Sequence, residues 1–191
     1  PRRPKIIYFM SCNNVRVQDV TLRNSAYWTQ DYEKCDGVIV RGVKVYCHSN
    51  WNNDGLDIDS RNVVVSDCYI DCDDDALCLK SDTDTPCENV TVTNCVLKTN
   101  CNAIKFGTSS YSGFKNVTIS NCVIDRASED HIRQWYKSYL WLGTKDKTVV
   151  AGIALESVDG GLMENVIISD IAMRAVQTPI FVRLGDRKRT F

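Results

Sequence analysis

A repeated segment limits what this chain can fold into. Six copies have an anchor residue, followed by apolar residues one, three, six and eight positions later. Apolar residues thus occupy every second position, with one interruption. This pattern predicts two short strands joined by a bend. The anchors are Asn14, Gly37, Asn62, Asn89, Asn116 and Asn165, which are separated by steps of 23, 25, 27, 27 and 49 residues. A period in the twenties predicts a solenoid of stacked coils.

A second strand follows in most of these units. The segments are "GLDIDS", "DALCLKS", "NAIKFGTS", "GIALES" and "TPIFVRL", and each alternates apolar residues with other residues. Their predicted inward residues are Leu56/Ile58, Leu77/Leu79, Ile104/Phe106, Ile153/Leu155 and Ile180/Val182. Three strands per coil without a helical segment predict an all-β fold, a right-handed parallel β-helix, over residues 1–191 as one domain.

The last step of 49 residues is longer than one coil. No strand pattern occurs inside it, so we expect residues 126–149 to be an aromatic-rich insertion over a normal coil. Its Trp135 and Tyr136 are candidates to stack on sugar rings, or to pin the insertion to the wall. The chain starts within a strand pattern and stops without a cap, so we expect the β-helix to be incomplete at both ends.

Ten cysteines first suggest a disulfide framework. However, Cys68, Cys95 and Cys122 alternate with Val and Ile six residues after the anchors. This position predicts a core column of free thiols. Disulfides in loops remain an alternative for four other cysteines, Cys12, Cys35, Cys87 and Cys101.

The formal net charge of −1 gives no indication of a nucleic acid or membrane partner. Four aspartates are instead crowded into five positions: Asp71, Asp73, Asp74 and Asp75. The strand pattern places Asp75 beside Asp54 on the preceding coil, ~4.8 Å away. Such crowding raises at least one pKa and is typical of a functional site. Paired carboxyl groups suit glycoside hydrolysis, and an aspartate cluster also suits a Ca²⁺ site.

The segment "NNDGLDIDS", followed one coil later by "DDDALCLKS", resembles family 28 of the glycoside hydrolases, the polygalacturonase and rhamnogalacturonase group. The resemblance implies inverting hydrolysis of α-linked pectic polysaccharide without a metal or other cofactor. It assigns the catalytic carboxyl groups to Asp54, Asp74 and Asp75, and does not say which is the general acid. It also implies a secreted or periplasmic protein.

The sequence departs from the family pattern downstream. Asn102 stands where the family has the histidine of G-H-G, and Gly152 and Ala154 replace the arginine and lysine of R-I-K. The cation pair that binds a substrate carboxylate is therefore absent. We expect either a different sugar in the cleaved subsite or Lys105 as the replacement cation, although Asp57 or Glu156 is an equally good partner for Lys105.

The residues expected to contact substrate are Asn102, Lys105, Asp57 and His48, with Trp135 and Tyr136 of the insertion. A salt-bridge ladder is expected for Lys80 and Arg183 with Asp59 and Glu156. Two other functions stay open. One is a Ca²⁺-dependent enzyme resembling pectate lyases, and the other is a carbohydrate-binding β-helix without catalytic activity.

Overall fold

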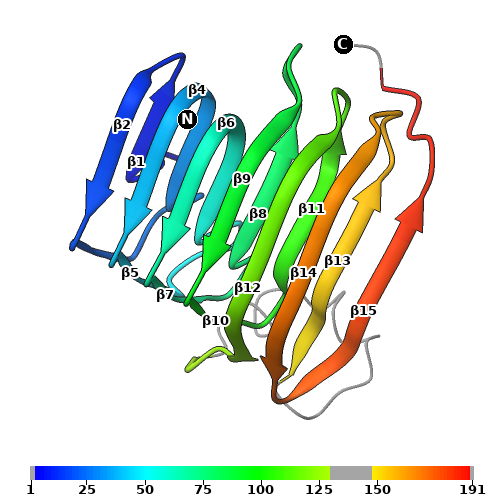
Figure 1. The fold of residues 1–191 in the computed structure, drawn as a ribbon. Coiled ribbons are helices and arrows are strands. Elements are labelled where there is room, and N and C mark those ends of the chain that lie inside the picture. Colours follow the sequence, from blue (N-terminus) through cyan, green and yellow to red (C-terminus); the bar gives the residue numbers. More distant parts are fainter. Residues whose placement is uncertain (1–2, 130–147, 190–191) are drawn as a thin grey trace.

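The computed structural model describes residues 3–129 and 148–189. These residues form a right-handed parallel β-helix, in which the chain winds through three sheets and the named strands pair in parallel (Figure 1). The predicted fold class is confirmed. Within the described ranges, no helix is long and apolar enough to cross a membrane.

Each coil contributes to three sheets, and the long strands bend from one sheet into the next. The first sheet contains β1 (Ile7–Met10), the start of β4 (Gln30–Arg41), the start of β6 (Leu56–Ser66), β8 (Leu77–Ser81), β11 (Asn102–Ser110), β13 (Val149–Ser157) and β15 (Val176–Leu184). The second contains β2 (Asn13–Gln18), the ends of β4 and β6, β9 (Cys87–Thr93), β12 (Phe114–Arg126) and β14 (Met163–Met173). The third contains β3 (Thr21–Arg23), β5 (Lys44–Cys47), β7 (Tyr69–Cys72), β10 (Val96–Thr99) and the ends of β12 and β14.

The anchor residues make the bend between the first and second sheets. Asn62, Asn89, Asn116 and Asn165 have φ between 51° and 57°. This left-handed conformation is costly for most L-residues, and asparagine tolerates it. Their side chains also form a ladder, in which each amide donates to the previous one over 3.0, 3.1 and 3.0 Å. Asparagine therefore serves both the backbone bend and the stacking of the coils.

The 49-residue step advances the solenoid by one coil. Asn165 donates directly to Asn116, β12 pairs with β14, and β11 pairs with β13. Residues 130–147 lie outside the described residues, and with them Trp135 and Tyr136.

The cysteine column lies in the core. Cys68, Cys95 and Cys122 are buried on adjacent coils and are unbonded, which confirms the predicted column. All ten cysteines are free thiols, so the structure contains none of the loop disulfides considered as an alternative.

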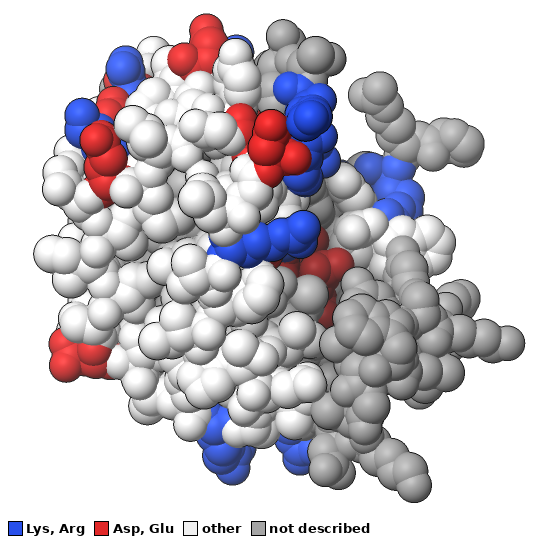
Figure 2. All heavy atoms as spheres, turned by 90° about the vertical axis from the view of Figure 1, so that its right-hand side faces the viewer, with Lys and Arg blue, Asp and Glu red and all other residues white. Residues whose placement is uncertain are grey.

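The predicted inward residues of the last described coil lie in register with those of the coil before, since Ile180 pairs with Ile153 and Val182 with Leu155. Ile180 and Val182 of β15 are 63% and 68% exposed. No further strand among the described residues closes this coil over them. Figure 2 looks onto this end, and much of the described surface there carries neither acidic nor basic side chains.

The asparagine ladder yields a stability prediction. Asn89→Ala places an ordinary L-residue at φ 55° and removes two ladder hydrogen bonds, so we expect it to lower the free energy of unfolding by about 2 kcal/mol. Asn89→Gly removes the same hydrogen bonds but tolerates the conformation, so about 1 kcal/mol is expected. Urea unfolding measures both values. Equal losses in the two variants would contradict the role given to the backbone bend.

Candidate active site

The candidate site lies at the turn where each coil enters the first sheet. The Gly55 amide donates to the Asp75 carbonyl over 2.8 Å, and the Ala76 amide donates to the Asn102 carbonyl over 2.9 Å. Asp54, Asp75 and Asn102 therefore occupy one column on three successive coils, as the strand pattern predicts.

Close backbone packing holds this turn. A Cβ at Gly55 would lie 2.3 Å from Cγ2 of Ile70 and 2.7 Å from the carbonyl oxygen of Ala76, so only glycine fits after Asp54. The buried Asn53 accepts a hydrogen bond from the Asp74 amide over 3.1 Å. The segment "NNDG" thus fixes its own turn and the position of the next one.

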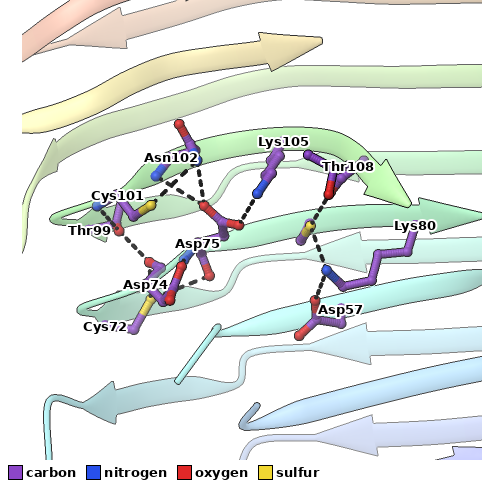
Figure 3. A network of polar contacts seen from close by, with 12 residues as sticks. Asp57, Cys72, Asp74, Asp75, Lys80, Thr99, Cys101, Asn102, Lys105 and Thr108 are labelled. Carbon is purple, nitrogen blue, oxygen red and sulfur yellow. Dashed lines mark hydrogen bonds and ion pairs between the residues drawn. The ribbon is translucent and has the colours of Figure 1, made fainter. Parts of the chain in front are cut away.

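The crowded aspartates divide into two groups with different partners. Asp71 and Asp73 contact His48, whereas Asp74 and Asp75 lie on the side of Lys105 (Figure 3). The division explains how one short segment holds four carboxyl groups, because each group has a cation of its own.

Asp75 is the carboxyl group that the site keeps ionised. Burial favours its neutral form, but the charge and hydrogen bond of Lys105 outweigh burial and hold the pKa of Asp75 below its usual value. The Lys105 ammonium lies 2.7 Å from Oδ2, and the Asn102 side-chain amide donates to Oδ1 over 2.7 Å. Asn102 thus binds a catalytic candidate here. The expected pairing of Lys105 with Asp57 or Glu156 is wrong, because the lysine reaches Asp75 one coil earlier.

The pKa values of Asp54 and Asp74 are raised, in contrast to that of Asp75. Burial, followed by the charge of Asp75, raises the pKa of Asp74 to about 6. Burial and the neighbouring Asp57 raise the pKa of Asp54 well above its usual value, and its buried Oδ1 has no hydrogen-bond partner. Asp54 and Asp75 are 4% and 2% exposed, whereas Asp74 is half-buried. The three adjacent carboxyl groups therefore differ in pKa and in solvent exposure.

The carboxyl groups lie close together. Oxygen atoms of Asp54 and Asp75 are within 4.8 Å of each other, and the same holds for Asp74 and Asp75. Inverting glycosidases usually separate their carboxyl groups by ~6.5–9.5 Å, and retaining enzymes by ~5–5.5 Å. Neither of these two pairs supplies the wide separation that inversion was expected to need.

Two sets of side chains in this cluster could hold a metal ion. One set is Asp54, Asp75 and Cys78, and the other is Asp74, Asp75 and Cys101. Each offers two carboxylates and one thiol, whereas Ca²⁺ takes six to eight oxygen ligands. Burial raises the pKa of both thiols well above the usual value, and Lys105 already occupies Asp75. The donor set is therefore a poor match for the Ca²⁺ site of a lyase.

His48 lies between two carboxylates instead of facing the catalytic candidates. Its Nδ1 bonds Asp73 over 3.1 Å, and its Nε2 lies 3.1 Å from Asp71. Burial lowers the pKa of His48, but the two aspartates outweigh burial and raise it to about 9. His48 also forms part of a pocket of about 400 Å³ that is lined by Arg23, Asn24, Tyr46, Ser49, Ser128 and Glu129. His48 is therefore the cation of the Asp71/Asp73 group, and its contact with substrate stays a prediction.

Asp57 is buried with Lys80 as its partner. The ammonium lies 3.2 Å from Asp57 Oδ1, and burial raises the pKa of Asp57 to about 7 although Lys80 opposes the rise (Figure 3). The expected ladder of Lys80 with Asp59 is wrong, since Asp59 accepts hydrogen bonds from the Asp82 amide and the Thr83 hydroxyl.

The column continues upstream with residues that the sequence analysis missed. Asp31 pairs with Asp57 in register, which places Trp28 opposite Asp54, and the register of Ile7 with Gln30 places Lys5 opposite Trp28. The polar Gln30 occupies an inward position and obscured the strand. The anchor step of 25 residues from Gly37 to Asn62, counted back from Asp54, gives Thr29, so the repeat marks this segment but not Trp28 itself.

The missing cation pair has a local cause. A Cβ at Gly152 would lie 2.6 Å from Sδ of Met173 and 2.9 Å from the carbonyl oxygen of Pro179, so no side chain fits there without a shift. Ala154 is fully buried in the column of Lys105. Neither position can present a cation to a substrate.

Comparisons with known proteins match most of the chain to one family. The sequence model described as "Glycosyl hydrolases family 28" matches residues 1–184. A probable polygalacturonase of Arabidopsis thaliana is 34% identical over 83 residues, which cover 42% of this chain and 18% of that protein. A probable polygalacturonase of Vitis vinifera is 30% identical over 84 residues, covering 43% and 17%. The matched parts are thus short relative to both relatives.

The His48 group yields a pH prediction. The folded-state pKa of His48, about 9, lies above the ordinary histidine value of 6.5, so this stabilisation is complete below pH 6.5 and is lost as pH rises through 9. His48→Ala leaves two buried carboxylates without a shared cation and should lower the free energy of unfolding by about 3 kcal/mol at pH 6. Denaturant unfolding at pH 6 and pH 9.5 tests this. If His48→Ala lowers the free energy of unfolding by the same amount at both pH values, the stabilisation does not come from a charged His48.

Proposed function

This chain belongs to glycosyl hydrolase family 28, and we propose that it hydrolyses α-linked pectic or related plant polysaccharide with Asp54, Asp74 and Asp75. The observation that supports this most is that three carboxyl groups lie together on adjacent turns and Lys105 pairs with Asp75, which favours unequal protonation. Hydrolysis of a glycosidic bond needs one carboxylic acid to protonate the leaving oxygen and one carboxylate to act on water.

We assign the general acid to Asp74 and the base to Asp75. Asp74 is the half-buried member of the three, and its pKa of about 6 keeps it protonated in mildly acidic solution. Asp75 stays ionised beside Lys105 under the same conditions. Burial raises the pKa of Asp54 well above its usual value, and we propose that its carboxyl group, beside Asp75, helps to orient the water.

We propose that the reaction inverts the anomeric centre and uses no metal. Inversion rests on the family resemblance, because two of the carboxyl pairs are closer than the usual range. The metal-free reaction is supported by the poor match of the cluster to Ca²⁺ and by the engagement of Asp75 with Lys105.

The cleaved subsite is proposed to take a sugar without a carboxylate. A buried carboxylate needs a cation, because an unpaired buried charge is very costly. Gly152 and Ala154 offer none, and Lys105 is committed to Asp75. This argument favours a branched or mixed pectic polymer over plain polygalacturonate.

One observation favours a second function. Asp54 and Asp75 are almost completely buried, and a carbohydrate-binding β-helix without catalytic activity needs no exposed carboxyl group. Such a protein would keep its sugar affinity when Asp74 is changed and would release no product.

The test is incubation with rhamnogalacturonan, side-chain oligosaccharides and polygalacturonate, with products separated and their anomeric configuration followed by NMR. We expect hydrolysis products with inverted configuration, the fastest from rhamnogalacturonan, and the same rate in EDTA. Asp74→Asn should lower turnover by about 10²–10⁴-fold, the usual contribution of general acid catalysis. Asp84→Asn, which changes an exposed carboxylate paired with Lys34, is the matched control.

Each alternative has its own signature. Unsaturated products that disappear in EDTA would indicate a lyase. Binding without products would indicate the non-catalytic protein. Fast, preferred cleavage of polygalacturonate by the unmodified protein would contradict the neutral subsite.

A further inference from the structure

The turn between β10 and β11 contacts two of the catalytic candidates on the preceding coil (Figure 3). The Thr99 hydroxyl donates to the backbone carbonyl of Asp74, and it accepts from the Cys101 amide over 2.8 Å. Asn102 donates its backbone amide and its side-chain amide to Oδ1 of Asp75, over 3.2 and 2.7 Å. One short segment therefore binds the main chain of one candidate and the carboxylate of the other.

Thr99 is a polar residue in an otherwise apolar column. Its side chain is fully buried, and the parallel register places it beside Cys72, which pairs in turn with Cys47. Both cysteines belong to the hydrophobic core, where a free thiol acts as a small apolar side chain. Burial of a hydroxyl costs free energy unless the hydroxyl forms hydrogen bonds. The two hydrogen bonds of Thr99 therefore account for a threonine at this position better than packing does.

The backbone of Asp74 is held by both neighbouring coils. Its amide donates to the Asn53 side chain of the coil before over 3.1 Å, and its carbonyl accepts from Thr99 of the coil after. The Cys72 thiol also donates to this carbonyl over 3.2 Å, but a thiol is a weak donor. Carboxyl oxygens of Asp74 and Asp75 lie within 4.8 Å of each other. The orientation of the Asp74 backbone thus sets how the two carboxyl groups face each other.

The turn lies on the coil where the family pattern has its histidine. Asn102 stands at that position, and a side-chain amide donates and accepts hydrogen bonds without exchanging a charge with its surroundings. The turn can instead contribute fixed geometry, and a misplacement of ~1 Å costs a reaction about 10²-fold in rate.

We propose that Thr99 is a positioning residue for the hydrolysis, whose hydroxyl fixes the Asp74 backbone against the following coil and so holds the general acid in place beside Asp75. The proposal rests on the proposed function. Because Thr99 is fully buried, it acts through Asp74 and does not contact substrate.

Ser60 offers a matched control. Its buried hydroxyl donates to the Tyr32 carbonyl over 2.8 Å and accepts from the Cys35 amide over 2.9 Å. These are the same two kinds of backbone hydrogen bond that Thr99 forms. Ser60 lies near the bend between the first and second sheets, at the opposite end of the first-sheet part of β6 from Asp54. Loss of its hydroxyl therefore tests the cost of such hydrogen bonds away from the candidate site.

Steady-state kinetics with rhamnogalacturonan tests the proposal. Thr99→Val keeps the shape of the side chain and removes the hydroxyl, so we expect kcat to fall by about 10²-fold with little change in KM. Thr99→Ser keeps the hydroxyl and should restore kcat to within about threefold of the parent value. Ser60→Ala should lower the free energy of unfolding to a similar extent as Thr99→Val and leave kcat unchanged.

The pH profile of kcat gives a second readout, because its alkaline limb reports loss of the proton from the general acid. The charge of Asp75 contributes to raising the pKa of Asp74 to about 6. A loosened backbone lets the two carboxyl groups move apart, so the alkaline limb of Thr99→Val should shift to lower pH, while that of Ser60→Ala stays in place. Among the described residues, the titratable groups that act on Asp74 are Asp54, Cys72, Asp75, Cys101 and Lys105.

A further variant keeps the proposal testable if Thr99→Val does not fold. Thr99→Cys introduces the residue that the same column carries at Cys72 and Cys47, so the position accepts it. Because a thiol is a weak donor, kcat should still fall by about tenfold or more. The proposal is overturned if the folded variant without the hydroxyl keeps the kcat and the alkaline limb of Ser60→Ala, or if Thr99→Ser does not restore kcat.

The proposed function and the role of Thr99 can fail separately. If the parent protein releases no product, NMR titration of the Asp74 carboxyl ¹³C signal still compares the variants. A lower midpoint in Thr99→Val than in Ser60→Ala would then keep the control of Asp74 by Thr99 and remove the hydrolase. Cleavage by the parent at a rate that Thr99→Val and Ser60→Ala both retain would keep the hydrolase and remove the positioning role.

Discussion

The backbone ladder between successive coils is the interaction on which the rest of the structure depends. Its parallel register holds equivalent residues ~4.8 Å apart, and the asparagine bends keep that register despite steps of different length. Because the ladder fixes columns, a side chain's neighbours come from other coils and not from its own segment. Lys5, Trp28, Asp54, Asp75 and Asn102 form one such column.

The ladder also creates an electrostatic problem, which cations solve. Stacked carboxyl groups repel each other, and burial makes the repulsion more costly. The protein places His48 on one side of the aspartate cluster and Lys105 on the other. Asp54 has no such partner for its buried oxygen, and burial raises its pKa well above the usual value. Burial and the cations thus shift the pKa values of neighbouring carboxyl groups in opposite directions, as acid/base chemistry requires.

The fold and the aspartate column could be predicted from the sequence because both follow from the period of the repeat. The same reasoning predicted the cysteine column correctly. The repeat did not predict the ion-pair partners of Lys80 and Lys105, because a lysine side chain has four flexible carbons and reaches a partner outside its own column. Trp28 was missed because the inward Gln30 breaks the apolar alternation that marks the other strands. Ile180 and Val182 are exposed despite their inward register, since alternation predicts direction and does not say whether a neighbour covers the residue.

The central claim is that Asp54, Asp74 and Asp75 differ in protonation. The most direct measurement is a pH titration of their side-chain carboxyl ¹³C signals by NMR, assigned through single Asp→Asn variants. We predict that Asp75 is still largely ionised at pH 3.8, the ordinary pKa of an aspartate, that Asp74 titrates near 6, and that Asp54 takes up its proton at higher pH than a solvated aspartate. Three signals that titrate together near 3.8 would contradict it.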